Sequence, residues 1–225
     1  NIAGPSRVNL DLRIPLSHDG TEGAYDVRAD LKDASLALPD TQIAFSKLRG
    51  RLGYRDDRGL FAEGLKGQFW GEPLVADIVT AAGNLQVNAR GQLAVPPLRE
   101  FIKLQSTRIL QGKTDVQAQL QVPLLESGAP VQLQVESQLQ GVAIDLPAPF
   151  AKAVDETRDI QVDVALTDKQ DIRVTAQGGV RAHLLMGGGV LQRTLLAVNS
   201  EDAELPGQGQ FRITGELDHF SLTEW

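Results

Sequence analysis

The chain has 225 residues, of which 42% are hydrophobic, and this composition favours a packed, folded protein over a disordered one. The formal net charge is −7 and no cluster of lysine or arginine occurs, which disfavours nucleic acid as a partner. There is no cysteine, so thiolate metal sites, cysteine nucleophiles and disulfides are all excluded.

The first quarter of the chain alternates apolar and polar residues. Residues 7–16 and 25–31 each show this period of two, separated by a turn at 18–23. A period of two places successive side chains on opposite faces of a β-strand. We therefore predict two strands, each with one aliphatic and one polar face.

From residue 43 to 79, turns recur every ~8 to 12 residues, which is typical of an antiparallel meander. Asp56 and Asp57 are adjacent carboxylates in one of these turns. Neighbours in sequence point in different directions and turns favour aspartate, so we interpret the two residues as turn residues rather than as a general acid and base.

A further alternating strand over 85–95 stops at Pro96 and Pro97. Leu98, Phe101 and Ile102 follow at helical spacing, and Pro97 suits the first turn of a helix. The spacing predicts one short helix over 97–110. This helix either packs onto the sheet as ordinary core or serves as a plug or lid at a hydrophobic groove.

The clearest pattern in the chain is a hairpin over 113–140, in which valine, leucine and alanine alternate with glutamine on both sides of a turn at 127–130. Alternating strands return at 160–166, 172–176, 180–184 and 211–217. Between them, Pro147 and Pro149 are spaced by one residue and predict a fixed loop, because proline is excluded from central strands.

Motifs for chemistry are absent from the sequence. The three histidines, His18, His183 and His219, lie far apart, and none belongs to a close metal-binding pair. No serine lies in a GxSxG nucleophile elbow. We therefore expect no enzyme activity, no cofactor and no metal.

These patterns predict a mainly all-β protein of about 14 strands. A sheet of this size curls, and it either forms an open trough or folds over into a dry sandwich. Aromatic residues make up only 5% of the chain, whereas a closed core of this size usually draws on aromatics to fill its volume. We favour an elongated, curled antiparallel sheet that forms a hydrophobic groove. We interpret 1–225 as one β-groove section, with 1–112 and 113–225 as a candidate subdivision.

The run from Leu139 to Lys152, with Leu146-Pro147-Ala148-Pro149 at its centre, resembles the recurrent segment of YhdP-like proteins of the AsmA-like family of Gram-negative bacteria. Residues 23–27 and 59–74 also resemble the strand units of these proteins. The resemblance extends over about 23–217, and its most distinctive part is the run around the two prolines.

The resemblance implies a section of a bridge-like conduit that moves phospholipid through the periplasm toward the outer membrane. It implies phospholipid and the remainder of a longer chain as partners, and an inner-membrane anchor in a segment outside this one. The sequence itself contains no apolar run of the ~20 residues that a membrane helix needs. No catalytic residue, cofactor or nucleotide site is implied.

We expect the aliphatic phase of the strands to line the groove. For each residue, packing within the protein's own core is the alternative to contact with lipid. The expected groove residues are Val8, Leu10, Leu12, Ile14, Tyr25, Val27, Leu85, Val87, Leu93, Val116, Leu120, Val122, Val131, Leu133, Val135, Ile160, Val162 and Val164.

Two other interpretations compete with a lipid conduit. The first is an AsmA-like structural or assembly module for outer-membrane biogenesis, whose apolar face is filled by its own helix and loops. The second is a glycan-binding or glycan-processing β-protein, which is disfavoured because it would need exposed aromatic platforms and paired carboxylates.

Overall fold

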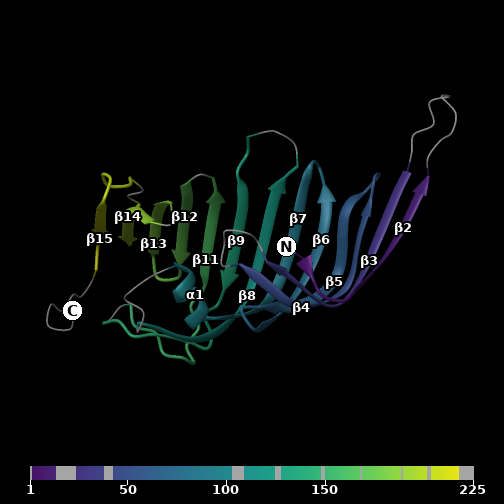
Figure 1. Cartoon of the computed structure of the whole chain (residues 1–225). Helices are drawn as coiled ribbons and strands as arrows, with labels where there is room; N and C mark the ends of the chain where they lie inside the picture. Colours follow the sequence, from purple (N-terminus) through teal and green to yellow (C-terminus); the bar gives the residue numbers. More distant parts are fainter. Residues whose placement is uncertain are drawn as a thin grey trace. The chain divides into compact units, whose positions relative to one another are not determined.

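The computed structural model describes residues 2–13, 24–37, 43–102, 109–124, 128–147, 150–167, 169–188, 190–201 and 204–217. These residues form fifteen strands and one short helix, which confirms the predicted all-β class (Figure 1). The elements are β1 (Ile2–Ala3), β2 (Ser6–Arg13), β3 (Ala24–Ala37), β4 (Ala44–Arg55), β5 (Gly59–Phe69), β6 (Glu72–Ala81), β7 (Asn84–Ala94), α1 (Val95–Ile102), β8 (Leu110–Pro123), β9 (Val131–Ser137), β10 (Val142–Ile144), β11 (Ile160–Leu166), β12 (Lys169–Ala176), β13 (Val180–Gly187), β14 (Val190–Val198) and β15 (Gln210–Gly215).

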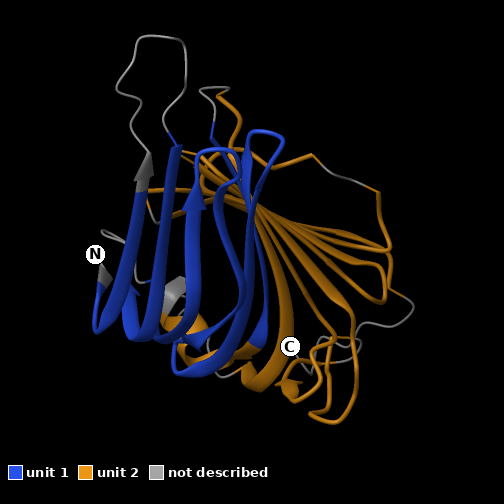
Figure 2. Ribbon diagram, turned by 90° about the vertical axis from the view of Figure 1, so that its right-hand side faces the viewer, with its two compact units in different colours: residues 1–91, 121–127 blue, residues 92–120, 128–225 orange. Residues whose placement is uncertain are grey.

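The chain divides into two compact units, which are coloured separately in Figure 2. Unit 1 consists of Asn1–Gly91 with Gln121–Ser127, and unit 2 of Gln92–Leu120 with Gly128–Trp225. The division falls within β7 and β8, so each of these two long strands contributes residues to both units.

Unit 1 is an antiparallel meander. Its strands follow one another in the order β1-β3-β4-β5-β6-β7, and β2 pairs with β3. Short turns join the consecutive strands from β4 to β7, as the recurring turn signals predict. Consecutive strands therefore lie side by side, and the alternation of each strand is continued by the next.

Two strands of unit 1 are bent by β-bulges. The register of β4 against β5 shifts on both sides of Arg49, and the register of β5 against β6 shifts between Ala62 and Leu65. Gly64 adopts a φ of 60° at this second bulge, and its N–H donates a 2.7 Å hydrogen bond to Oδ1 of Asp77. Bulges increase local twist and bend a strand, so they curl the meander.

The bent region holds the best-buried apolar residues of unit 1. Leu48 and Leu65 are each 9% exposed, although both are large side chains. The residues around them are small, so the neighbouring strands approach closely there. These small residues are Ala34, Ala62 and Ala76.

Unit 2 is also built mainly from antiparallel strands. Strands β9, β11, β12, β13 and β14 are joined by antiparallel ladders, and β10 pairs with the beginning of β8. The exception is β15, which runs parallel to β14 after the connection 199–209. Strand β14 is the best-buried strand, with Leu195, Ala197 and Val198 at 2%, 1% and 3% exposure.

The single helix of the described residues confirms the predicted short helix near 97–110. Its described part spans Val95–Ile102, residues 103–108 lie outside the described residues, and Leu110 belongs to β8. Pro96 and Pro97 both lie in its first turn, where the missing N–H groups would have no partner in the helix anyway. None of the helical residues described here forms a span long and apolar enough to cross a membrane.

Candidate functional site

The aliphatic residues of unit 1 form continuous rows across the sheet. Residues directly opposite on neighbouring strands point to the same face, so the pairing register shows which side chains are aligned. One row runs across β2 to β5, and a second runs across β2 to β7. The first consists of Leu10, Val27, Tyr54 and Leu60, and the second of Val8, Ala29, Leu52, Ala62, Ile78 and Val87. We call this surface the aliphatic face of unit 1.

Unit 2 carries an equivalent surface, the aliphatic face of unit 2. The register of β9 to β15 aligns two rows of mostly branched or aromatic apolar side chains. One row is Leu133, Val164, Ile172, Leu184, Thr194 and Phe211, and the other is Val135, Val162, Val174, Ala182, Leu196 and Ile213.

Neither face is sealed within the described residues. No large side chain there is fully buried, and the predicted groove residues whose side chains are described are all partly or largely exposed. Val8 and Leu10 are 60% and 65% exposed on β2, and Phe211 and Ile213 are 63% and 60% exposed on β15. Contiguous exposed apolar surface of this kind is typical of binding surfaces rather than of closed cores.

The structure brings several of the predicted residues together directly. Leu133 pairs with Val164 and Val135 with Val162 in unit 2, and Leu10 pairs with Val27 in unit 1. The backbone of Leu12 lies in β2, and Ile14 lies outside the described residues.

Sequence reasoning missed part of each face. In unit 1 it did not assign Leu52 and Leu60, which lie on the bulged strands β4 and β5, or Ile78, which alternates regularly on β6. Glycine in a strand interior signals a bulge, and Gly50 and Gly64 occupy such positions. In unit 2 the missed residues of β12 to β15 follow the same simple alternation as their neighbours.

The opposite face of unit 1 is charged. Asp26 pairs with Arg28 at 2.6 Å, and Asp30 pairs with Arg51 at 3.2 Å. These side chains are solvent-exposed, so each pair contributes at most about 1 kcal/mol to stability. Their main effect is to keep one side of the sheet hydrated while the other side remains apolar.

In unit 2, the loop after β10 is held by two cations. Lys152 is 3% exposed, and its Nζ donates hydrogen bonds to the carbonyl oxygens of Val142 and Ala153 at 2.8 and 3.0 Å. Burial lowers the pKa of Lys152 from its usual 10.5. Arg158 donates from Nη1 and Nη2 to the carbonyl oxygens of Phe150 and Ala151 at 3.2 and 2.8 Å. All four acceptors are backbone carbonyl oxygens, so both side chains hold this loop in place.

Across the described ranges, no three His, Asp or Glu side chains gather closely enough to hold a metal ion. Nε2 of His183 lies 3.0 Å from Oδ1 of Asp171. Nε of Arg173 lies 3.4 Å from the same oxygen, so the Asp171 carboxylate is shared by a histidine and an arginine.

The fold and this surface define a class: β-sheet proteins that present a broad, partly exposed aliphatic face, which in unit 1 is backed by a charged, solvent-exposed face. The family model of the YhdP protein matches residues 1–225, so the chain belongs to the YhdP family, within the broader AsmA-like family. Neither a curated protein nor a solved structure matches the chain.

Proposed function

We propose that this chain is a section of a periplasmic phospholipid conduit between the inner and outer membranes. Acyl chains lie along the aliphatic faces of its two units. The observation that carries the proposal is the set of aliphatic rows that run from strand to strand while their large side chains stay partly exposed. The membership in the YhdP family supports the same assignment.

The energetics favour a mobile apolar ligand over an empty surface. Covering apolar surface contributes about 25 cal/mol per Å². A ligand that covers a few hundred Å² therefore gains on the order of 5–10 kcal/mol before the cost of immobilising it. Because the rows consist of similar branched side chains, this gain changes little from one strand to the next. A lipid can then move across the strands without being held in a deep free-energy minimum.

The proposal includes the setting of the protein. The conduit is expected to be periplasmic and to be joined to the inner membrane through a segment of a longer chain. It has phospholipid as its cargo and works without a catalytic residue, a cofactor or a metal ion. The hydrated outer face keeps the sheet in solution while the aliphatic face carries lipid.

Native mass spectrometry of the purified chain, followed by lipid extraction, tests the proposal. We expect co-purified phospholipid in the native protein. Leu133→Asp puts a charge on the aliphatic face, where contact with acyl chains costs on the order of 2–3 kcal/mol, so bound lipid should fall severalfold. Gln132→Asp adds the same charge to the other face of β9 and is the matched control. Circular dichroism checks that both variants are folded.

The alternative, an AsmA-like structural or assembly module, predicts a different outcome. In that case the native chain is free of lipid, takes up none from vesicles, and unfolds cooperatively. Leu133→Asp would then destabilise the fold, because it places a charge in a closed core.

A further inference from the structure

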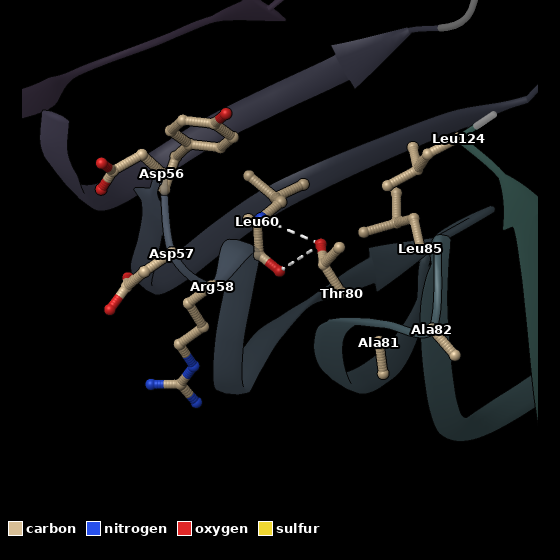
Figure 3. A pocket seen from close by; sticks show the side chains of 11 residues that line it. Asp56, Asp57, Arg58, Leu60, Thr80, Ala81, Ala82, Leu85 and Leu124 are labelled. Atoms are coloured by element: carbon tan, nitrogen blue, oxygen red, sulfur yellow. Dashed lines mark hydrogen bonds between the residues drawn. The ribbon is translucent and has the colours of Figure 1, made fainter. Parts of the chain in front are cut away.

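A cavity of about 440 Å³ lies at one end of the strands of unit 1, where the aliphatic face meets the turns (Figure 3). We call it the rim cavity. Leu60, Leu85 and Leu124 form its apolar wall, and its polar lining includes Tyr54, Asp56, Asp57 and Arg58. Leu124 is 54% exposed and Tyr54 is 46% exposed, so the wall is open to a ligand.

Hydrogen bonds fix the backbone of the residues that form the apolar wall. Thr80 lies between Leu60 and Leu85, and its Oγ1 accepts a 3.0 Å hydrogen bond from the N–H of Leu60 and donates one to the carbonyl oxygen of the same residue (Figure 3). The N–H of Leu124 donates to the carbonyl oxygen of Gly83 at 2.9 Å. The cavity is therefore lined by strand ends whose backbone positions are fixed, rather than by a loose loop.

Among the described residues, Asp56 is the carboxylate of the turn that forms no direct ion pair, and it attracts Arg55 only at longer range. Arg55 forms a two-pronged ion pair with Asp57, in which Nε lies 2.9 Å from Oδ1. Arg58 is stacked on Phe61, with its guanidinium carbon 4.3 Å from the ring centre. Both arginines of the turn are thus engaged. In the described part of the chain, no ion pair involves Asp56, which also lines the cavity.

Both tyrosines of the chain lie at this rim. Tyr54 is opposite Val27 on β3, and Tyr25, two residues before Val27, therefore points to the same aliphatic face. The N–H of Asp56 donates to the carbonyl oxygen of Tyr25 at 3.3 Å, which holds the backbone of the turn against the end of β3. Tyrosine has an apolar body and a polar tip, and it concentrates where hydrocarbon meets lipid headgroups.

The depth of the face below the rim matches that of a lipid chain. The six-residue step from the buried Leu48 to Tyr54 spans at most about 20 Å, at about 3.3 Å per residue. One leaflet of a bilayer has a hydrocarbon depth of about 15 Å. Polarity therefore changes along β4 as it does through a leaflet: buried Leu48, then partly exposed Leu52, then Tyr54, then the carboxylate of Asp56.

From this geometry we infer that the rim cavity is a headgroup site for an ammonium-bearing, zwitterionic phospholipid of the ethanolamine type. The acyl chains lie on the aliphatic face, the carboxylate of Asp56 pairs with the ammonium group, and the ring of Tyr54 adds a cation–π contact. This inference rests on the proposed function, because it assumes that the face binds lipid. It adds a preference among headgroups and an orientation, with the headgroup at the strand ends.

Competition between two headgroups tests the inference. The chain is incubated with vesicles of equal parts phosphatidylethanolamine and phosphatidylglycerol, re-isolated, and its bound lipids are quantified by mass spectrometry. We expect the native chain to be enriched in phosphatidylethanolamine about two- to fivefold, which is the effect of one solvent-exposed charge pair. Asp56→Asn should remove this enrichment while the total bound lipid stays the same.

Asp30→Asn is the matched control, because it removes the same charge from the opposite face of unit 1, where Asp30 pairs with Arg51. It should retain the enrichment. An Asp56→Asn chain as enriched as the native protein, or a native chain with no preference, would overturn the headgroup site and leave the conduit standing. A native chain that binds neither lipid would overturn the conduit itself.

Discussion

Lys152 donates a 2.8 Å hydrogen bond from its ammonium group to the carbonyl oxygen of Val142, and both residues are buried, at 3% and 2% exposure. The same ammonium group donates to the carbonyl oxygen of Ala153 at 3.0 Å. Backbone carbonyls are neutral acceptors, so this lysine is a buried charge solvated by dipoles rather than by a direct carboxylate partner. Asp155 and Glu156 act on it only through longer-range electrostatic attraction.

The stability lost when Lys152 is replaced should therefore depend strongly on the new side chain. Lys152→Met keeps most of the volume and removes the charge along with two hydrogen bonds, and we expect a change in the free energy of unfolding of less than about 1.5 kcal/mol. Lys152→Glu turns a carboxylate toward two carbonyl oxygens and should destabilise the chain by about 3–5 kcal/mol. Urea unfolding followed by circular dichroism measures both. Equal losses for the two variants would contradict this account.

The lowered pKa of Lys152 also predicts a pH dependence. Between the folded-state pKa and the usual value of 10.5, the unfolded chain binds more protons at this residue than the folded chain. The contribution of Lys152 to stability should therefore rise with pH through this window and level off above it. The free energy of unfolding of the native chain minus that of Lys152→Met, measured from pH 7 to 10.5, isolates the effect because other groups cancel. A flat or falling difference would count against it.

A close approach of two strands predicts that Gly112 cannot be replaced. Its φ is 109°, and a Cβ at this position would lie 2.0 Å from the carbonyl oxygen of Gly141. Gly112→Ala should destabilise the chain by more than about 3 kcal/mol, because the backbone of β10 would have to move. Gly64 is the matched control: its φ is also positive, at 60°, but nothing lies within 4 Å of a Cβ there. Gly64→Ala should cost only about 1–2 kcal/mol. Thermal unfolding of both variants compares them.

The sequence predicts most of the strands because one face of each is apolar and the other is polar. The alternation over Val131–Ser137 and Ile160–Leu166 fixes both the strands and the side chains that point together. The bounds of α1 were harder to predict. Leu98, Phe101 and Ile102 set the helical period, but the pattern does not show that the helix begins at Val95 or that Leu110 belongs to a strand.

Features that depend on distant residues could not be predicted from the sequence. The parallel pairing of β15 with β14 is one such feature, because alternation within β15 is the same for either strand direction. The rim cavity joins Leu60, Leu85 and Leu124, which come from three separate parts of the chain. Asp56 resembled an ordinary turn residue, because the engagement of Arg55 and Arg58 elsewhere is visible only in three dimensions.

Alanine substitutions at two leucines on the aliphatic side of unit 1 should distinguish effects on stability from effects on lipid binding. Leu48 is 9% exposed beside the bulges, whereas Leu10 is 65% exposed on β2. Leu48→Ala should cost about 2–5 kcal/mol of stability, because it leaves a cavity among tightly packed strands. Leu10→Ala should change stability by less than about 0.5 kcal/mol, because little packing is lost.

The same pair of variants should rank in the opposite order for lipid. Leu10→Ala removes apolar surface that a bound acyl chain would cover, so bound phospholipid should fall, whereas folded Leu48→Ala should keep it. Urea unfolding and lipid extraction from the same preparations measure both quantities. If Leu10→Ala were as destabilising as Leu48→Ala, β2 would be packed against a closed core. If Leu10→Ala lost neither stability nor lipid, acyl chains would not reach β2.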